Sequence, residues 1–159
     1  MGKKQPSEKI TSEKCAARVM ETIPLAMRFI RSDIRSRNSS TMSVPQFRTL
    51  AFLDRNPGAS LSDLAEHLGV TAATASANTE RLVQRNFVNR SDHPQSRRRV
   101  VLSLTEAGLE HLQQCRAQTR DRIAELFNNL AEEQILLIEE GLTLLQQVFD
   151  ENSIQQPKQ

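Results

Sequence analysis

The sequence of 159 residues contains no tryptophan and no tyrosine, and its aromatic residues are six phenylalanines. Proteins that bind single-stranded nucleic acid usually stack bases on aromatic side chains, so this shortage disfavours such a partner. The two cysteines, Cys15 and Cys115, are far apart and too few for a disulfide framework. No leader and no apolar run long enough to cross a bilayer is present. We therefore expect a cytoplasmic protein with reduced thiols and no membrane partner.

Signatures of catalysis are also missing. The chain has only three histidines, and it carries no nucleophile elbow, no glycine-rich phosphate loop and no pair of carboxylates in a catalytic pattern. We expect no enzyme and no cofactor. The length suits one domain with a core of ordinary size.

Charge is unevenly distributed along the chain. Residues 81–99 hold six arginines and one acid, Asp92, for a net charge of +5. Residues 121–151 hold eight acids and one base, Arg122, for a net charge of −7. One pole of the molecule should therefore attract nucleic acid, and the other should repel it.

Two short helices joined by a tight turn are predicted between Leu61 and Arg85. Ser62 is expected to cap the first helix, and Gly69 to end it, because glycine tolerates the left-handed conformation that follows a helix. Thr71 then caps the second helix, which should end near Arg85. A turn of this length is typical of a helix-turn-helix.

Small and polar side chains open the second helix, which leaves room for close approach to base edges in a major groove. Methyl groups can contact thymine there, and an asparagine amide can pair with adenine. The predicted DNA-contacting residues of this helix are Thr71, Ala72, Ala73, Thr74, Ser76, Asn78 and Arg81.

A β-hairpin is predicted after this helix. Asn86 stops the helix, since asparagine tolerates a positive φ, and the arms 87–90 and 100–104 flank a polar tip at 92–96. Four arginines on the hairpin suit phosphate oxygens or the narrow minor groove of A·T-rich DNA, and the alternative is a turn kept soluble by charge. They are Arg90, Arg97, Arg98 and Arg99.

These motifs in combination resemble the MarR family of winged-helix transcriptional regulators, over nearly the whole chain. The corresponding residues are Leu61-Ser62-Asp63-Leu64-Ala65, Gly69-Val70-Thr71, Thr74, Ser76, Arg81-Leu82-Val83, Val88-Asn89-Arg90, Arg97-Arg98 and Leu104-Thr105-Glu106-Ala107-Gly108. The family commonly has arginine where this chain has Ala77 and aspartate where it has Ser96. The resemblance implies a two-fold dimer, formed by the first and last helices, that binds double-stranded DNA and responds to a small effector in the cleft beside the winged region.

The expected fold is mainly α with a small β-hairpin wing. It is one domain over residues 8–150, in which a winged helix-turn-helix at 43–104 is flanked by dimerisation helices at 8–36 and 105–150, with flexible tails at 1–7 and 151–159. Apolar residues recur at helical spacing in both flanking segments, and these stripes are most simply explained by pairing with a second copy. Two-fold symmetry then predicts an inverted-repeat operator.

The expected function is a sequence-specific DNA-binding regulator that represses as a homodimer and responds to a small organic effector. One alternative is a sensor of the same fold. Cys15 lies where the peroxide-sensing branch of the family has a reactive cysteine, although the surrounding tyrosines are absent, and a buried residue in a dimer stripe is the plainer interpretation. His111 and Cys115 share a helix face and suit two metal ligands, but two are too few. The sequence also leaves open a protein-interaction module and an architectural DNA binder without a preferred site.

Overall fold

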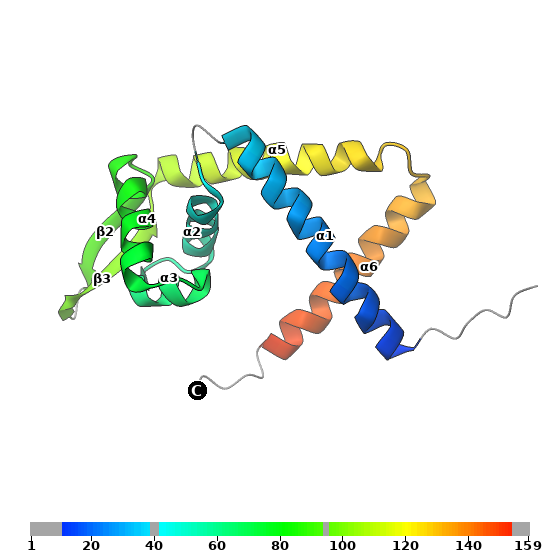
Figure 1. Ribbon diagram of the computed structural model, residues 1–159, viewed down its shortest axis with the longest axis horizontal. Coiled ribbons are helices and arrows are strands. Elements are labelled where there is room, and N and C mark those ends of the chain that lie inside the picture. Colours follow the sequence, from blue (N-terminus) through cyan, green and yellow to red (C-terminus); the bar gives the residue numbers. More distant parts are fainter. Residues whose placement is uncertain (1–10, 39–41, 94–95, 154–159) are drawn as a thin grey trace, which may run out of the picture. The chain divides into compact units, whose positions relative to one another are not determined.

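The computed structural model describes residues 11–38, 42–93 and 96–153, which form a mostly helical protein with one small antiparallel sheet (Figure 1). This confirms the expected fold class. In chain order the elements are α1 (Ser12–Asn38), α2 (Val44–Arg55), β1 (Ala59–Ser60), α3 (Leu61–Leu68), α4 (Ala72–Gln84), β2 (Val88–His93), β3 (Ser96–Leu104), α5 (Glu106–Phe127) and α6 (Glu132–Ser153). The chain divides into two compact units, Met1–Thr119 and Arg120–Gln159.

The core of the first unit is a cluster of leucines contributed by α2, α3, α4, β3 and α5. Each of these elements turns an apolar face inward, and truncation of one such buried leucine typically costs about 2–5 kcal/mol of unfolding free energy. The fully buried members are Leu50, Leu53, Leu64, Leu82, Leu102 and Leu112. This core holds the helix-turn-helix and the hairpin together as one winged region.

The sheet has the order β1-β3-β2, so β3 is its central strand. Strands β2 and β3 pair from Val88 opposite Leu104 to His93 opposite Ser96, with an irregularity after Asp92. The paired arms are therefore longer than expected, and residues 94–95 of the expected tip lie outside the described residues. Strand β1, which pairs with β3, was not predicted, because two residues are too short to show a strand period.

The N-cap of α3 is Ser60, and the expectation of Ser62 was wrong. The Ser60 hydroxyl accepts a hydrogen bond from the Asp63 N–H at 3.1 Å, and the Asp63 carboxylate accepts one from the Ser60 N–H at 3.0 Å. Starting the helix after Ser62 would put Ala65 at the third helical position, where it has no side-chain acceptor to return the bond. The capping box therefore fixes the start of the helix two residues earlier.

The capping-box spacing of Ser43 and Gln46 predicts the start of a helix, and α2 begins there. Each backbone N–H of this pair donates to the other's side chain, at 2.9 and 3.4 Å. The helix is expected to bury Val44, Phe47, Leu50 and Ala51. Of these, Leu50 is buried and the other three are half-buried.

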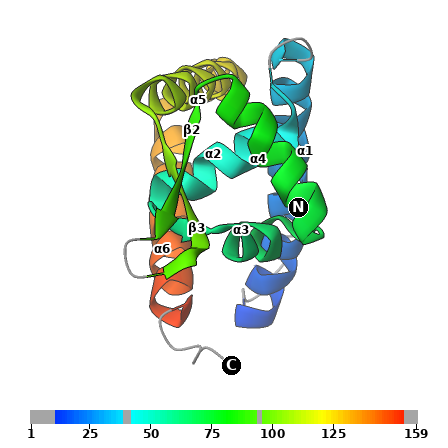
Figure 2. The same cartoon turned by 90° about the vertical axis from the view of Figure 1, so that its left-hand side faces the viewer.

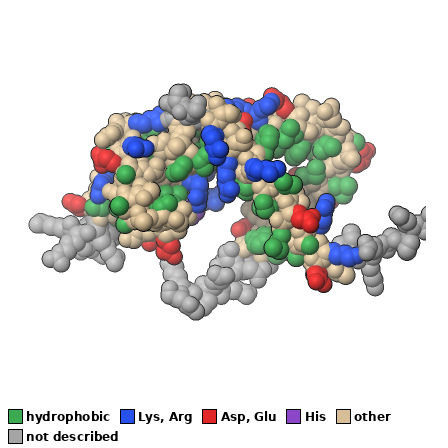
Figure 3. All heavy atoms as spheres, in the orientation of Figure 1, with side chains coloured by type: hydrophobic (Ala, Val, Ile, Leu, Met, Phe, Trp, Pro, Cys, Tyr) green, Lys and Arg blue, Asp and Glu red, His purple; other side chains and the backbone are tan. Residues whose placement is uncertain are grey.

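Helices α1 and α6 expose much of their apolar surface within the single chain. In α1, of the residues whose burial the structure describes, only Asp33 and Ile34 are buried. Figure 3 shows hydrophobic side chains at the surface along α6, and the large ones are Ile135, Leu136, Leu137, Ile138, Leu142, Leu144, Val148 and Phe149. Helix α6 runs to Ser153, past the expected start of the C-terminal tail at residue 151. The expected tail at 1–7 and the first residues of the helix expected at 8–36 lie outside the described residues. No helix in the described part of the chain is long and apolar enough to cross a membrane.

Candidate nucleic-acid interface

The turn between α3 and α4 has the geometry that the sequence predicts. Gly69 ends α3 in the left-handed region at φ 69°, and its N–H donates to the carbonyl of Glu66. Thr71 has an extended backbone, and its hydroxyl accepts a hydrogen bond from the Thr74 N–H at 3.2 Å. Glycine and the threonine cap together fix the direction in which α4 leaves the turn.

Helix α4 buries one face and exposes the other. Ala75, Thr79 and Leu82 face the core, and the Thr79 hydroxyl donates to the Ala75 carbonyl at 2.8 Å. The opposite face is exposed and contains two alanines one turn apart, Ala73 and Ala77. A helix with such small side chains along its outer face can approach a groove closely.

The seven predicted contact residues at and along α4 differ in exposure. Five are exposed and two are half-buried, and one of the half-buried residues, Asn78, faces α2. The exposed ones are Thr71, Ala72, Ala73, Thr74 and Arg81, and Ser76 is half-buried.

Asn78 is the residue that faces α2. Its Nδ2 donates to the hydroxyl oxygen of Thr49 at 2.7 Å and to the carbonyl of Pro45 at 3.4 Å. The amide donor is therefore engaged inside the protein, which departs from our expectation that Asn78 pairs with adenine. The sequence gives no signal for this contact, because Thr49 lies in another helix.

Sequence reasoning also missed Glu80, which lies beside the wing. Arg90 on β2 is 3.9 Å from the Glu80 carboxylate, and both side chains are exposed. The pair joins strand β2 to helix α4. Figure 2 shows that the β2–β3 hairpin starts beside the end of α4. The other three predicted wing arginines, at 97–99, lie on β3, and their side chains are outside the described part of the structure.

The start of α5 fastens the junction between α4 and β2. Asn86 adopts a φ of 58°, as its helix-stopping role predicts. The Thr105 hydroxyl donates to the Asn86 carbonyl at 2.6 Å, and the Thr105 N–H donates to the Phe87 carbonyl at 3.1 Å. The Phe87 ring stacks on His111 of α5, with ring centroids 4.7 Å apart. These contacts fix the position at which strand β2 follows the end of α4.

The candidate sensing residues lie on α1 and α5. Cys15 is exposed on α1, and Cys115 is buried, with its sulfur 3.9 Å from Nε2 of His111. Burial, and to a smaller extent the charge of Arg85, lower the pKa of His111, so its imidazole is neutral near pH 7. The structure thus brings the predicted pair together. Within the described residues, no three histidine, cysteine or acidic side chains are grouped to hold a metal ion.

Comparison with known proteins shows which family the winged region resembles. Residues 42–100 match the sequence profile of the MarR family. The uncharacterized HTH-type transcriptional regulator YfiV of Bacillus subtilis (strain 168) is 28% identical over 109 residues, which cover 69% of this chain and 68% of YfiV.

Solved structures share the fold at lower identity. The transcriptional regulator Tm0710 from Thermotoga maritima has a TM-score of 0.72 and 21% identity, over 90% of this chain and 99% of that one. Streptococcus pneumoniae FabT, crystallised in complex with DNA, has a TM-score of 0.58 and 19% identity, over 89% of this chain and 99% of that one. The capped turn, the exposed face of α4 and the hairpin that follows it are thus parts of a winged helix-turn-helix, and residues 42–100, which include the turn, α4 and most of the hairpin, are similar to the MarR family.

Proposed function

We propose that the protein is a sequence-specific repressor that binds double-stranded DNA as a homodimer. The observation that carries the proposal is the outer face of α4. It offers Ala73 and Ala77 at its centre, with Thr74 and Arg81 beside them, and no large apolar side chain obstructs it. Alanine methyl groups suit thymine, and arginine suits guanine, so this face can select a sequence.

Charge around this face supports DNA over a protein partner. The segment 81–99 has a net charge of +5, and it contains the end of α4 and most of the hairpin. Guanidinium groups on a wing can contact phosphates or enter a minor groove while the helix lies in the major groove. FabT, which shares the fold, is crystallised with DNA, which agrees with this assignment.

The exposed apolar residues of α1 and α6 support a dimer. Large side chains such as Leu142 and Phe149 are more than half exposed in the single chain, and a second copy would cover them. Two copies related by a two-fold axis would place their recognition helices in successive major grooves, about 34 Å apart.

We further propose that a small organic effector relieves repression. A ligand that binds better to a dimer with a different helix spacing would lower operator affinity by population shift. The bound dimer represses by covering the site that polymerase needs.

The direct test is selection of purified protein against a random duplex library near physiological salt. An enriched inverted repeat, with half-sites about ten base pairs apart, is the expected result. Binding without enrichment would instead indicate an architectural DNA binder, and no binding would favour a protein-interaction module.

Two variants sharpen this test. Ala77→Glu places bulk and negative charge on the outer face of α4 and should abolish enrichment, whereas Gln113→Glu adds the same charge at an exposed position of α5 and should leave it intact. Arg98→Ala should weaken binding to all sequences and flatten the slope of log affinity against log salt by ~1. An unchanged slope would remove Arg98 from the set of phosphate contacts.

A further inference from the structure

We propose that Asp33 and Thr119 are positioning residues that set the angle at which α1 leaves the winged region, and through it the spacing of the two recognition helices. The proposal rests on the dimeric function proposed above. It assigns a role in DNA recognition to a buried polar contact between α1 and α5.

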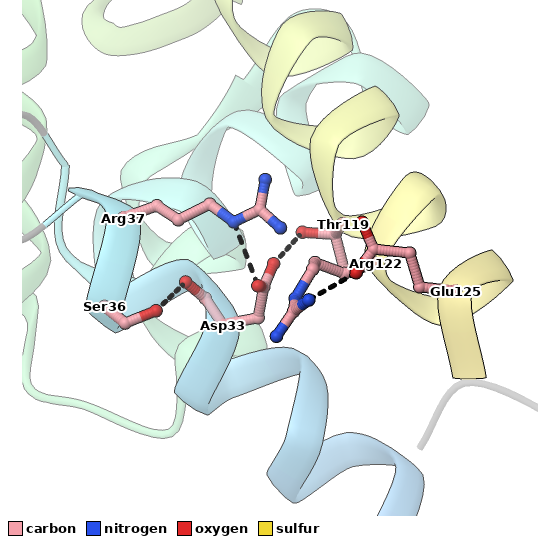
Figure 4. A network of polar contacts seen from close by, with 6 residues as sticks. All are labelled: Asp33, Ser36, Arg37, Thr119, Arg122 and Glu125. Carbon is pink, nitrogen blue, oxygen red and sulfur yellow. Dashed lines mark hydrogen bonds and ion pairs between the residues drawn. The ribbon is translucent and has the colours of Figure 1, made fainter.

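The contact joins two helices that are distant in sequence. The Asp33 carboxylate, on α1, accepts a hydrogen bond from the Thr119 hydroxyl on α5 at 2.9 Å through one oxygen (Figure 4). Its other oxygen accepts from Nε of Arg37, one turn further along α1, at 3.0 Å. The Asp33 side chain is only 7% exposed. Both carboxylate oxygens are therefore satisfied in a site that contains little water.

A buried carboxylate is sensitive to the position of its partners. Away from water, an aspartate that loses a hydrogen-bond donor has no solvent to replace it, so the pair tolerates little relative movement of the two helices. An apolar contact at the same place can slide with a smaller loss, because hydrophobic burial is not directional. The choice of Asp33 and Thr119 here favours one fixed arrangement of α1 on α5.

The attachment of α1 at this point is narrow. Asp33 and its neighbour Ile34 are the only buried residues among those of α1 whose burial is described. The helix extends about 30 Å beyond Asp33 toward its N-terminus, at 1.5 Å per residue. A tilt of roughly 10° at Asp33 would move the far end by about 5 Å on that length. This exceeds the step of one base pair, about 3.4 Å.

The tilt of α1 links the contact between Asp33 and Thr119 to the choice of operator. If α1 joins the two copies, its angle to the winged region determines how far apart the two copies of α4 lie. Loosening the contact should therefore widen the range of half-site spacings that the dimer accepts, while each half-site is still read by an unaltered α4.

Three variants separate positioning from simple stability. Thr119→Val keeps the shape of the side chain but removes the donor to Asp33, and Thr119→Ser restores it. Ser36→Ala is the matched control, because the Ser36 hydroxyl donates at 2.9 Å to the Asp33 carbonyl within α1 and does not reach α5 in this contact.

The first measurement needs no DNA. A nitroxide label is attached to the Ala77→Cys variant, in which Cys15→Ser removes the exposed native cysteine. The remaining cysteine, Cys115, is only 4% exposed and should not be labelled. Pulsed electron paramagnetic resonance then measures the distance between the two labels of the dimer. The second measurement is the affinity, in unlabelled protein, for inverted repeats whose half-sites are separated by different spacers. We expect Thr119→Val to shift or broaden the distance distribution by about one base-pair step, ~3.4 Å, and to flatten the dependence on spacer length. Thr119→Ser and Ser36→Ala should match the parent in both measurements.

An unchanged distance distribution and an unchanged spacer preference in folded Thr119→Val would overturn the proposal, even if the variant were less resistant to urea. Should that variant not fold, Asp33→Asn combined with Thr119→Val removes the buried charge together with its donor and takes its place. A parent protein that forms no dimer, or that selects no inverted repeat, contradicts the proposed function and this inference with it. A dimeric, site-selective parent whose variants keep their spacing contradicts only the inference.

Discussion

The side chain of Asn78 occupies the side of α4 that faces α2, and this placement determines what its substitution should do. Asn78→Ala removes the donor to Thr49 and Pro45, and loss of such a hydrogen bond costs about 0.5–1.5 kcal/mol. We expect a lower free energy of unfolding in urea, with the same preferred DNA sequence in a selection experiment. Arg81→Ala, on the exposed face, should instead change the preferred DNA sequence and leave the free energy of unfolding the same. A new sequence preference for Asn78→Ala at unchanged stability would return Asn78 to the base-contacting residues.

At His111 the expected effect is a dependence of stability on pH. Burial, followed by the charge of Arg85, lowers its pKa below the ordinary value of 6.5. Below pH 6.5 the unfolded chain therefore binds more protons than the folded one, so the contribution of this group to stability is complete above that pH and is lost as the pH falls through the folded-state pKa.

His111→Phe is the variant that tests this linkage. It keeps a ring that can stack on Phe87 and removes the titrating group. We expect its free energy of unfolding to fall less between neutral pH and about pH 5 than that of the parent. His67, whose pKa is lowered by burial and then by Arg48 and Arg55, is present in both proteins and contributes equally to both. Parallel pH profiles for the two proteins would exclude His111 as a source of the dependence.

At the scale of elements, α5 approaches the junction after α4 closely at Gly108. A Cβ atom on Gly108 would lie 2.0 Å from the Phe87 carbonyl oxygen, which is backbone and cannot turn aside. Gly108→Ala must therefore push α5 away from the base of the wing, and we expect a loss of about 1–3 kcal/mol or more in the free energy of unfolding.

Gly141 provides the matched control. It is a helical glycine in α6, and a Cβ atom there would meet nothing within 4 Å. Gly141→Ala should stabilise its helix by about 0.5–1 kcal/mol, because alanine loses less backbone entropy than glycine on folding. Urea unfolding of both variants measures the contrast, and equal effects of the two substitutions would show that α5 is not held tightly at Phe87.

The ends of elements were more predictable from sequence than the contacts between them. The box of Ser43 and Gln46, the turn at Gly69 and the stop at Asn86 are local, since each residue interacts with neighbours a few positions away. The error at Ser62 is of the same kind, because Ser60 and Asp63 offered a correctly spaced box that local reasoning could have found.

Contacts between elements left no comparable trace in the sequence. Asn78 could not be placed against Thr49, because that contact depends on how α4 crosses α2. The bond between Asp33 and Thr119 spans 86 positions, and no spacing rule reaches so far. The family resemblance indicated the winged helix-turn-helix, but the direction of individual side chains depends on tertiary packing.

At the scale of the whole molecule, positive charge and the exposed apolar surface of α6 are separated along the chain. The basic segment 81–99 belongs to the winged region, whereas 121–151, with a net charge of −7, includes most of α6 and its exposed leucines. An acidic segment contributes nothing to holding DNA, but an apolar face within it can bind a second copy while its charges stay in water. The basic middle of the chain therefore suits contact with DNA, and its acidic C-terminal part suits contact between copies.

The proposed dimer predicts how a single charge in α6 should act on DNA binding. Leu142 is 55% exposed in the single chain, and Leu142→Glu would place a charge in the proposed apolar interface. We expect sedimentation equilibrium to show a monomer, with Gln113→Glu as a dimeric control of equal charge. Affinity for a single half-site should stay the same, because the winged region is untouched. Affinity for the full inverted repeat should fall by roughly 10²-fold or more, because the second half-site is no longer bound by a tethered partner. A variant that remains dimeric would place the interface away from Leu142, and equal losses on half-site and full site would mean that the substitution damages the winged region itself.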